Sequence, residues 1–209
     1  MAEVEHSMVS ALAGIAKTGR YGRPGSTPGV TAHELTGFGL ATVSARNGSR
    51  SALVEAARGV FGLELPMTPR CADGPNLSMI WCGPDQWLAM APEAPAQGME
   101  ALLRGSLGAH AAIADQSHAR VLLRLSGPRL RDTLAKGIPI DLHPRAFKPG
   151  DTAATQVSHV GIQIWQIDSA PTYDIAAYRS TIGSLWHWLE TSAAEYGLEF
   201  VRSKLRPAP

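Results

Sequence analysis

The stretch ARVLLRLSGPRLRDTLAKG, residues 119–137, is the most informative for the fold, because a strand pattern in it is followed directly by a helix pattern. Its first part alternates, with Val121, Leu123 and Leu125 on one side, as a β-strand with a buried face does. Its second part opens with a proline, which suits the first turn of a helix, and closes with Gly137, which suits the position just after a helix. A strand that runs directly into a helix predicts a domain in which helices pack on a sheet.

The segments after this unit predict three more strands, a long helix and a closing strand. DTAATQVSHV and GIQIWQID are expected as two strands that turn near Val160 and Gly161, and TYDIAAYR as the third. RSTIGSLWHWLETSAAEYG carries one apolar stripe at helical spacing, and Gly197 ends it. LEFV then returns to a strand pattern.

The segments before residue 119 predict the same kind of order. GLATVSAR is expected as a strand, and the helix that follows it starts from a cap at Ser51. LSMIWCGPDQWLAMAP predicts two strands joined by a Gly-Pro-Asp turn. A second helix is expected over about residues 97–107 and a short strand over residues 111–115.

Two similar units in one chain predict an α+β architecture of two pseudo-repeated split βαβ units, each βαββαβ-like. The expected division is a single domain over residues 37–209, with halves at about 37–118 and 119–209, preceded by an N-terminal arm over residues 1–36. A chain of 209 residues with 44% hydrophobic content is long enough for such a domain and its core.

The arm is predicted from composition. Residues 14–36 are rich in Gly, Pro, Thr and Ser and show neither a helical nor a strand period. The segment GRYGRPG within it is not a dinucleotide fingerprint, because no strand is predicted before it and no helix after it. Such an arm is either disordered or laid on a partner, and Tyr21 is then a candidate contact residue.

Charge and composition exclude several classes of protein. The chain has 19 basic and 18 acidic side chains, a net charge of +1 and no basic run, so neither nucleic acid nor a membrane is an expected partner. Glu3 and Glu5 stand where a secretory signal would have Lys or Arg, so a cytoplasmic location is predicted. Cys71 and Cys82 fit neither a zinc pair nor a redox pair and are expected as reduced thiols.

Side chains that could carry chemistry do not form a recognisable set. Four of the seven histidines, His118, His143, His159 and His187, lie on separate predicted elements, without the spacing that places two imidazoles on one metal. Ser117 and His118 lack the GxSxG context of a nucleophile. SGPR at residues 126–129 could hold an anion at a helix N-terminus, but a plain helix cap is the simpler interpretation. We therefore expect no catalytic, cofactor-binding or metal-binding residues in this chain.

The segment GIPIDLHPRAFKPGD, residues 137–151, is a long connection between the predicted helix and the next strand. Three prolines restrict it, and long ordered loops are often contact elements. Arg145, Phe147 and Lys148 are the candidates for contact with another chain, since arginine and aromatic residues are common interface anchors. The alternative stays open that Phe147 fills its own domain while Arg145 and Lys148 remain in water.

One segment resembles a known family. DQSHARVLLRLSGPRLRDTL, residues 115–134, is similar to the Asp-x-Ser-His pattern, followed by Gly and Leu, in the folate-binding fold of glycine-cleavage aminomethyltransferases, a family of βαββαβ repeats. The sequence after residue 134 departs from that of the transferases and resembles the gamma subunits of heterotetrameric sarcosine oxidases. This similarity runs from about Phe38 to the C-terminus.

The resemblance to the transferases breaks where they have an acidic pair in a Gly-x-x-Asp-Asp-Leu run. This chain has GIQIWQ at residues 161–166, so Ile164 and Trp165 replace the two carboxylates. Asp168 is a poor substitute, because a shift along the strand points it to another place on the sheet. The resemblance therefore implies a transferase-type scaffold without its chemistry.

What the sarcosine oxidase resemblance implies is a non-catalytic subunit of an oxidoreductase. The assembled enzyme would oxidise sarcosine to glycine, pass the one-carbon unit to tetrahydrofolate and release hydrogen peroxide. The implied partners are alpha, beta and delta subunits, which would carry FAD, FMN, NAD, tetrahydrofolate and zinc, while this chain would carry no cofactor. The competing interpretation is a free-standing folate- or pterin-binding protein. A binding protein should have one deep pocket, whereas a subunit should expose apolar side chains.

Overall fold

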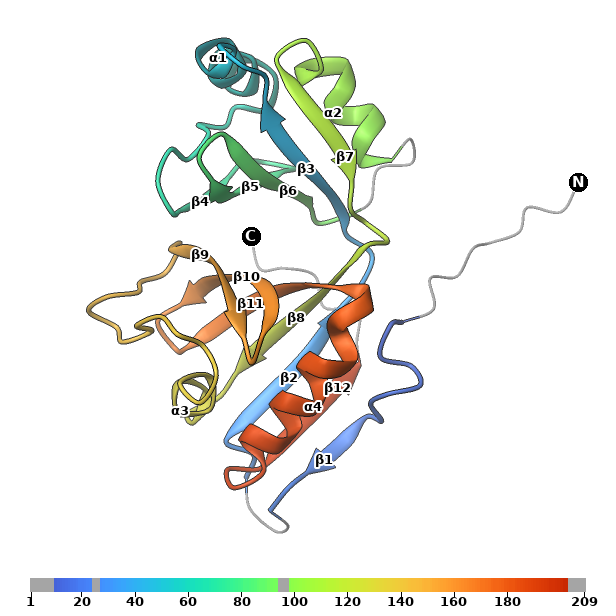
Figure 1. The fold of residues 1–209 in the computed structure, drawn as a ribbon, viewed down its shortest axis with the longest axis vertical. Helices are drawn as coiled ribbons and strands as arrows, with labels where there is room; N and C mark the ends of the chain where they lie inside the picture. Colours follow the sequence, from blue (N-terminus) through green and yellow to red (C-terminus); the bar gives the residue numbers. More distant parts are fainter. Residues whose placement is uncertain (1–9, 24–26, 94–97, 203–209) are drawn as a thin grey trace, which may run out of the picture.

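The computed structural model describes residues 10–23, 27–93 and 98–202. Two β-sheets are stacked on each other, and two helices pack against the outer face of each sheet (Figure 1). The first nine residues of the predicted arm, and Gln97 at the start of the second predicted helix, lie outside the described residues.

The five-stranded sheet and its helices come from the middle of the chain. Its strands follow the order β4-β5-β6-β3-β7 and every neighbouring pair is antiparallel. The elements are β3 (Gly39–Ala45), α1 (Arg50–Phe61), β4 (Cys71–Asp73), β5 (Ser78–Gly83), β6 (Gln86–Ala91), α2 (Met99–Leu107) and β7 (Ala111–Asp115).

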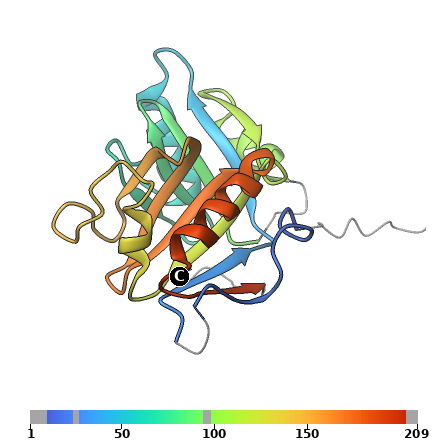
Figure 2. The ribbon, with the colours of Figure 1, turned by 60° about the horizontal axis from the view of Figure 1, so that its bottom comes forward.

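The seven-stranded sheet joins the two ends of the described chain. Its order is β1-β12-β2-β8-β11-β10-β9, in which β2 and β12 are parallel and the other pairs antiparallel. Figure 2 shows β2 and β12 side by side. The elements are β1 (Gly19–Tyr21), β2 (Val30–Leu35), β8 (Arg120–Ser126), α3 (Leu130–Leu134), β9 (Thr152–Val157), β10 (Val160–Asp168), β11 (Thr172–Tyr178), α4 (Ile182–Ala193) and β12 (Leu198–Arg202).

The strand β8 shows how the layers form. Val121, Leu123 and Leu125 point to the core under α3 and α4, as their alternation predicts. Leu122, on the opposite face, belongs to a second apolar cluster that lies between the two sheets. Because both faces of β8 are covered, all four of its Val and Leu side chains are buried, although Arg120, Arg124 and Ser126 interrupt the apolar run.

Most predicted elements are confirmed, with four local differences. The helix expected from Pro128 to just before Gly137 is only the five residues of α3, and Pro128 lies before its first turn. The first helix begins at Arg50, and the residue before it, Ser49, makes no side-chain cap, so the predicted cap at Ser51 is wrong. The hairpin between β9 and β10 turns at Ser158 and His159, whose positive φ angles of 45° and 71° reverse the chain, rather than at the following two residues. The short strand β4 was not predicted.

The prediction that residues 14–36 lack regular structure is wrong, since β1 and β2 both lie there. Residues 30–35 belong to the seven-stranded sheet and not to an arm. The strand β2 lies between β12 and β8, and its sequence VTAHEL alternates only over four residues, with Val30 and Ala32 buried and Thr31 and His33 partly exposed, before two successive buried residues end the pattern. Even Glu34 in this strand is only 2% exposed.

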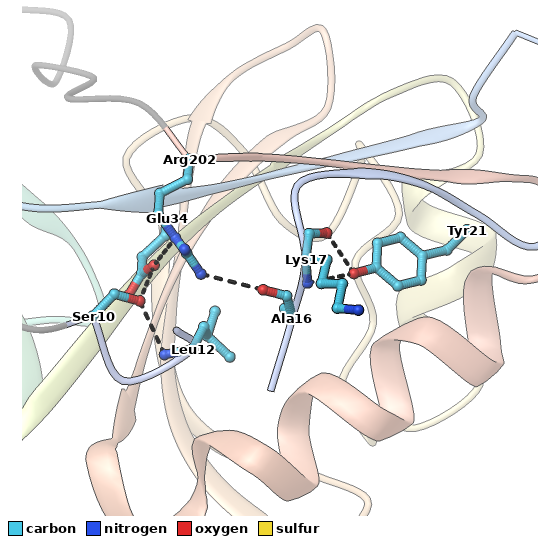
Figure 3. Close-up of polar contacts among 7 residues, drawn as sticks. All are labelled: Ser10, Leu12, Ala16, Lys17, Tyr21, Glu34 and Arg202. Atoms are coloured by element: carbon cyan, nitrogen blue, oxygen red, sulfur yellow. Dashed lines mark hydrogen bonds and ion pairs between the residues drawn. The ribbon is translucent and has the colours of Figure 1, made fainter. Parts of the chain in front are cut away.

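The segment before β1 is held against the same sheet (Figure 3). The Ser10 hydroxyl donates to both carboxylate oxygens of Glu34, at 2.8 and 2.6 Å, and Arg202 Nε lies 3.4 Å from Glu34. Arg202 also donates to the Ala16 carbonyl at 3.2 Å. Leu12 is fully buried in the core under α4. The described part of the predicted arm is therefore part of the fold.

Over the described ranges, no helix has the length and apolarity that crossing a membrane requires.

Candidate functional site

The inner face of the seven-stranded sheet, which faces the other sheet, is laid out in three rows. Strand register places Arg120 beside Tyr178, Leu122 beside Ala176, and Arg124 beside Asp174. The neighbouring strands continue these rows, because alternate residues share a face. The outer row is Arg120, Tyr178, Gly161 and Gln156; the middle row is Leu122, Ala176, Gln163 and Ala154; the inner row is Arg124, Asp174, Trp165 and Thr152.

The inner row contains a buried ion pair. Arg124 Nε and Nη2 donate to the two Asp174 carboxylate oxygens at 2.7 and 2.9 Å, and the two side chains are 13% and 1% exposed. Burial raises the pKa of the Asp174 carboxyl, and the hydrogen bonds from Arg124 oppose that rise. Both carboxylate oxygens accept bonds from Arg124, so Asp174 is held as a structural partner rather than as a free base.

A cavity of about 150 Å³ adjoins this ion pair between the sheets. Cys71 and Ser78 line it from the five-stranded sheet, and Gln166 from β10. The Gln166 amide nitrogen donates to the Asp168 carbonyl at 2.6 Å, while its buried carbonyl oxygen has no hydrogen-bond partner in the described structure. Burial raises the pKa of the Cys71 thiol, so this side chain is a neutral wall of the cavity.

The middle row ties the two sheets together through Gln163. Its amide nitrogen donates to the Trp81 carbonyl of β5 at 3.0 Å and to the Thr152 hydroxyl at 2.5 Å. Thr152 in turn donates to the Ile164 carbonyl at 3.0 Å. Because Gln163 is only 3% exposed, these bonds fix the distance between the sheets at this point.

The outer row opens into a groove of about 690 Å³ between the sheets. Arg120 Nη2 donates to the Tyr178 hydroxyl at 3.2 Å, and the guanidinium carbon lies 4.5 Å from the centre of the tyrosine ring. Cys82 and Gln86 line the groove from the five-stranded sheet, and His159 from the β9–β10 turn. Burial raises the pKa of the Cys82 thiol to about 11, against the opposing effect of the Arg120 charge.

The run that replaces the transferases' acidic pair lies within the packed layers. Ile164 is fully buried toward α3 and α4, and Trp165 is 3% exposed between the sheets. Asp168 is exposed at the end of β10, where its carboxylate accepts the backbone N–H groups of Ala170 and Thr172. Asp168 therefore shapes the β10–β11 turn.

The predicted contact residues separate into two groups. Arg145 and Lys148 are exposed on the loop between α3 and β9. Phe147 is only 7% exposed and packs in the core, with its ring centre 6.2 Å from that of Tyr173. The interpretation of Phe147 as a surface contact is wrong for this arrangement, because its side chain is buried in the core of its own domain. The alternative held open from the sequence describes Phe147 correctly.

Tyr21 lies far from that loop in the sheet order, on β1 at one edge, whereas the loop leads into β9 at the other. Its ring packs edge-on against Trp186 of α4 at 5.5 Å, and its hydroxyl donates to the Lys17 carbonyl (Figure 3). Tyr21 thus helps to hold the N-terminal segment on its own domain, and the structure does not bring it together with Arg145 and Lys148.

Sequence reasoning missed the Arg124–Asp174 pair and the outer row. A signal was available, since VLLRLS and TYDIAAY each carry one charged residue of opposite sign within an otherwise apolar strand. The sequence pattern could not show that β8 and β11 are neighbouring strands, or that their register places Asp174 beside Arg124. Within the described part of the chain, no group of three or more His, Cys, Asp or Glu side chains is placed to hold a metal ion.

The family profile and the similar curated proteins point to the same family. The profile of the sarcosine oxidase, gamma subunit family matches residues 46–195. The sarcosine oxidase subunit gamma of Arthrobacter sp. is 31% identical over 174 residues, covering 82% of this chain and 84% of that protein. The protein of the same name from Corynebacterium sp. (strain P-1) is 32% identical over 156 residues, covering 73% of each chain.

Solved structures agree with these relatives. A chain of the heterotetrameric sarcosine oxidase from Corynebacterium sp. U-96, in complex with pyrrole 2-carboxylate, superposes with a TM-score of 0.74 and 27% identity, covering 90% of this chain and 95% of that one. The glycine cleavage system aminomethyltransferase T from Bartonella henselae gives a TM-score of 0.60 at 17% identity, covering 83% of this chain and 48% of that protein. The transferase likeness confirms the predicted relation in fold.

Proposed function

This chain belongs to the sarcosine oxidase, gamma subunit family, and we propose on that basis that it is a non-catalytic subunit of a heterotetrameric sarcosine oxidase. The assembled enzyme would be an oxidoreductase that demethylates sarcosine to glycine. The one-carbon unit would pass to tetrahydrofolate, and hydrogen peroxide would be released. The role of this chain in that assembly is to support the complex.

The observation that carries the non-catalytic role is the placement of residues 161–166. Ile164 and Trp165 fill two apolar layers at the position of the transferases' acidic pair. The nearest buried carboxylate, Asp174, has both oxygens engaged by Arg124. A general acid or base must be able to reach a reacting group, and neither arrangement offers one.

Partners and cofactors follow from the same proposal. The other chains would be alpha, beta and delta subunits, and they would carry FAD, FMN, NAD, tetrahydrofolate and zinc. This chain would hold none of these groups and would reside in the cytoplasm. Arg145 and Lys148, and to a lesser extent the half-buried Tyr21, remain proposed contacts with the partner subunits.

We also propose that the two halves are pseudo-repeats of one split βαβ unit, with the boundary near residue 118. The succession β3-α1-β4-β5-β6-α2-β7 has the same order of element types as β8-α3-β9-β10-β11-α4-β12. The sheet orders 4-5-6-3-7 and 9-10-11-8-12 also correspond, once β2 is recognised as a strand inserted between β8 and β12. These correspondences support a common origin of the halves.

The alternative of a free-standing folate- or pterin-binding protein receives less support. The cavity beside Arg124 and Asp174 measures about 150 Å³, below the roughly 300 Å³ at which pockets for such ligands begin, and the larger groove at the outer row, of about 690 Å³, is open to solvent rather than a deep pocket. Two of the cavity's three charged side chains, Arg124 and Asp174, also satisfy each other rather than a ligand.

The test is coexpression of this chain with the neighbouring subunit genes, followed by size-exclusion chromatography. We expect the chain to coelute with flavin-containing subunits, and the same chain purified alone to show no flavin absorbance. Within the assembled enzyme, Asp168→Asn should keep sarcosine turnover within about threefold, far from the roughly hundredfold loss of a general acid or base. Elution of the chain apart from the flavoprotein would refute the proposal.

A further inference from the structure

Arg120 is placed at the mouth of the groove between the two sheets, and its charge is not neutralised there. The residues that line the groove include Arg120 and His159 but no aspartate or glutamate. Within residues 10–23, 27–93 and 98–202, Arg120 forms no ion pair, and its hydrogen-bond partner is the neutral Tyr178 hydroxyl. The comparable arginine of the inner row, Arg124, has Asp174 beside it.

The Arg120 guanidinium also has a buried donor without an acceptor. Its Nε is inaccessible and has no hydrogen-bond partner in the described structure. A docked partner could not reach Nε itself, so the guanidinium would meet an acceptor through its terminal nitrogens, of which Nη2 donates to the neutral Tyr178 hydroxyl. A carboxylate is the acceptor that suits a guanidinium best, because two parallel N–H groups meet two oxygens.

The floor of the groove leaves room beside Arg120 and Tyr178. Gly161 is the next outer-row position, and a Cβ placed on it would meet no atom within 4 Å. Tyr178 is 48% exposed, one of the few large apolar side chains that the described fold leaves in water. Tyrosine and arginine are among the residues enriched at the energetic centre of protein interfaces.

We propose that this groove docks an acidic segment of a partner subunit, with an aspartate or glutamate carboxylate on Arg120 and an apolar neighbour against Tyr178. The site is open on one side and is walled by strands of both sheets, which suits an inserted polypeptide segment more than an enclosed small molecule. The inference rests on the proposed function, since it names the surface through which the subunit assembles.

The first experiment tests contact directly in the assembled complex. Arg120→Lys places a primary amine in the groove, and a water-soluble carbodiimide joins an amine to a carboxylate that already touches it. We expect peptide mass spectrometry to find residue 120 linked to an Asp or Glu of a partner subunit. Arg46→Lys, at an exposed arginine outside the groove, is the matched control and should give no such link. A complex in which residue 120 stays unlinked while other partner cross-links form would overturn the proposal.

The second experiment blocks the groove without changing its charge. Gly161→Leu is compatible with the backbone, because Gly161 does not have a positive φ, and its side chain would enter open space. We expect the melting temperature of the isolated chain to stay unchanged and its affinity for the partner subunits to fall about tenfold or more, as at other interface centres. Normal affinity would show that nothing docks over Gly161.

The outcomes separate this inference from the proposed function. If the wild-type chain does not coelute with the flavoprotein subunits, both fail. If it coelutes but Arg120→Lys forms no link and Gly161→Leu assembles normally, only the groove is misassigned. If acetate at millimolar concentration protects Arg120 of the isolated chain from phenylglyoxal, and residue 120 is unlinked in the complex, the groove takes a small carboxylate instead.

Discussion

Arg124 and Asp174 face each other across β8 and β11, joined by two hydrogen bonds of 2.7 and 2.9 Å in the layer between the two sheets. The pair lies at the closed end of the same face whose open end carries Arg120 and Tyr178. One sheet face therefore holds two arginines in different states, one neutralised within the chain and the other available to a partner.

The buried pair predicts an asymmetry between single and double substitutions. Asp174→Asn leaves the Arg124 charge buried without a counter-ion and should lower the free energy of unfolding by about 3–5 kcal/mol. The double variant Arg124→Leu with Asp174→Leu removes both charges and should be more stable than Asp174→Asn. Urea denaturation of the isolated chain measures both. Equal losses in the two variants would mean that packing, and not charge, dominates at this site.

His33 on β2 predicts how stability depends on pH. Burial, and then the charge of Arg124 opposite it in the register, lower the pKa of His33 from its usual 6.5, against an opposing effect of Glu199. Below pH 6.5 the unfolded chain binds the proton before the folded chain does. The His33 contribution to stability is thus fully present above that pH and is lost as the pH falls toward the lowered pKa.

The measurement is the free energy of unfolding between pH 5 and 7.5 for the wild type and for His33→Gln. We expect the wild type to lose more stability on acidification than the variant. His187→Gln, on α4, controls for removing a histidine elsewhere. Identical pH profiles for the wild type and His33→Gln would contradict the assignment.

The loop over residues 137–151 predicts separate roles for its neighbouring side chains. Phe147→Ala empties a core position beside Tyr173 and should cost about 3–5 kcal/mol of stability. Arg145→Ala with Lys148→Ala, both exposed, should change stability by less than about 0.5 kcal/mol yet weaken assembly with partner subunits. Thermal melts and coelution measure the two effects. A double variant that assembles normally would remove this loop from the interface.

The raised pKa of Cys82 predicts that its thiol reacts slowly with alkylating reagents near neutral pH. With its pKa raised to about 11, only about 0.1% of the thiol is ionised at pH 8, and the thiolate is the reactive form. In a Cys71→Ala background, the rate of alkylation by iodoacetamide should rise about tenfold per pH unit from pH 7 to 9.5. An unfolded control in urea should instead level off near the usual thiol pKa of about 8.5. A plateau at that pH in the folded chain would show that Cys82 is not buried as described.

The sequence alone determined the elements whose patterns are local. The alternation in residues 119–126 and the apolar stripe of α4 each reflect contacts of one element with one core, so period and turn residues suffice to place them. The resemblance in residues 115–134 added the family. By the same logic, Ile164 and Trp165 were recognisable as apolar where a carboxylate pair would be needed.

Only the tertiary structure decided which residues meet. The strand β2 is established by its pairing with β8 and β12, because its own alternation covers only four residues and ends in the two buried residues Glu34 and Leu35. Phe147 points inward because the loop folds back over the core, a choice that its neighbours in sequence do not encode. Arg124 is neutralised and Arg120 is not, although both occupy the same face of β8, because strand register places Asp174 beside the one and Tyr178 beside the other. Register is set by the pairing of whole strands, and pairing between distant segments is a property of the folded sheet rather than of any one stretch.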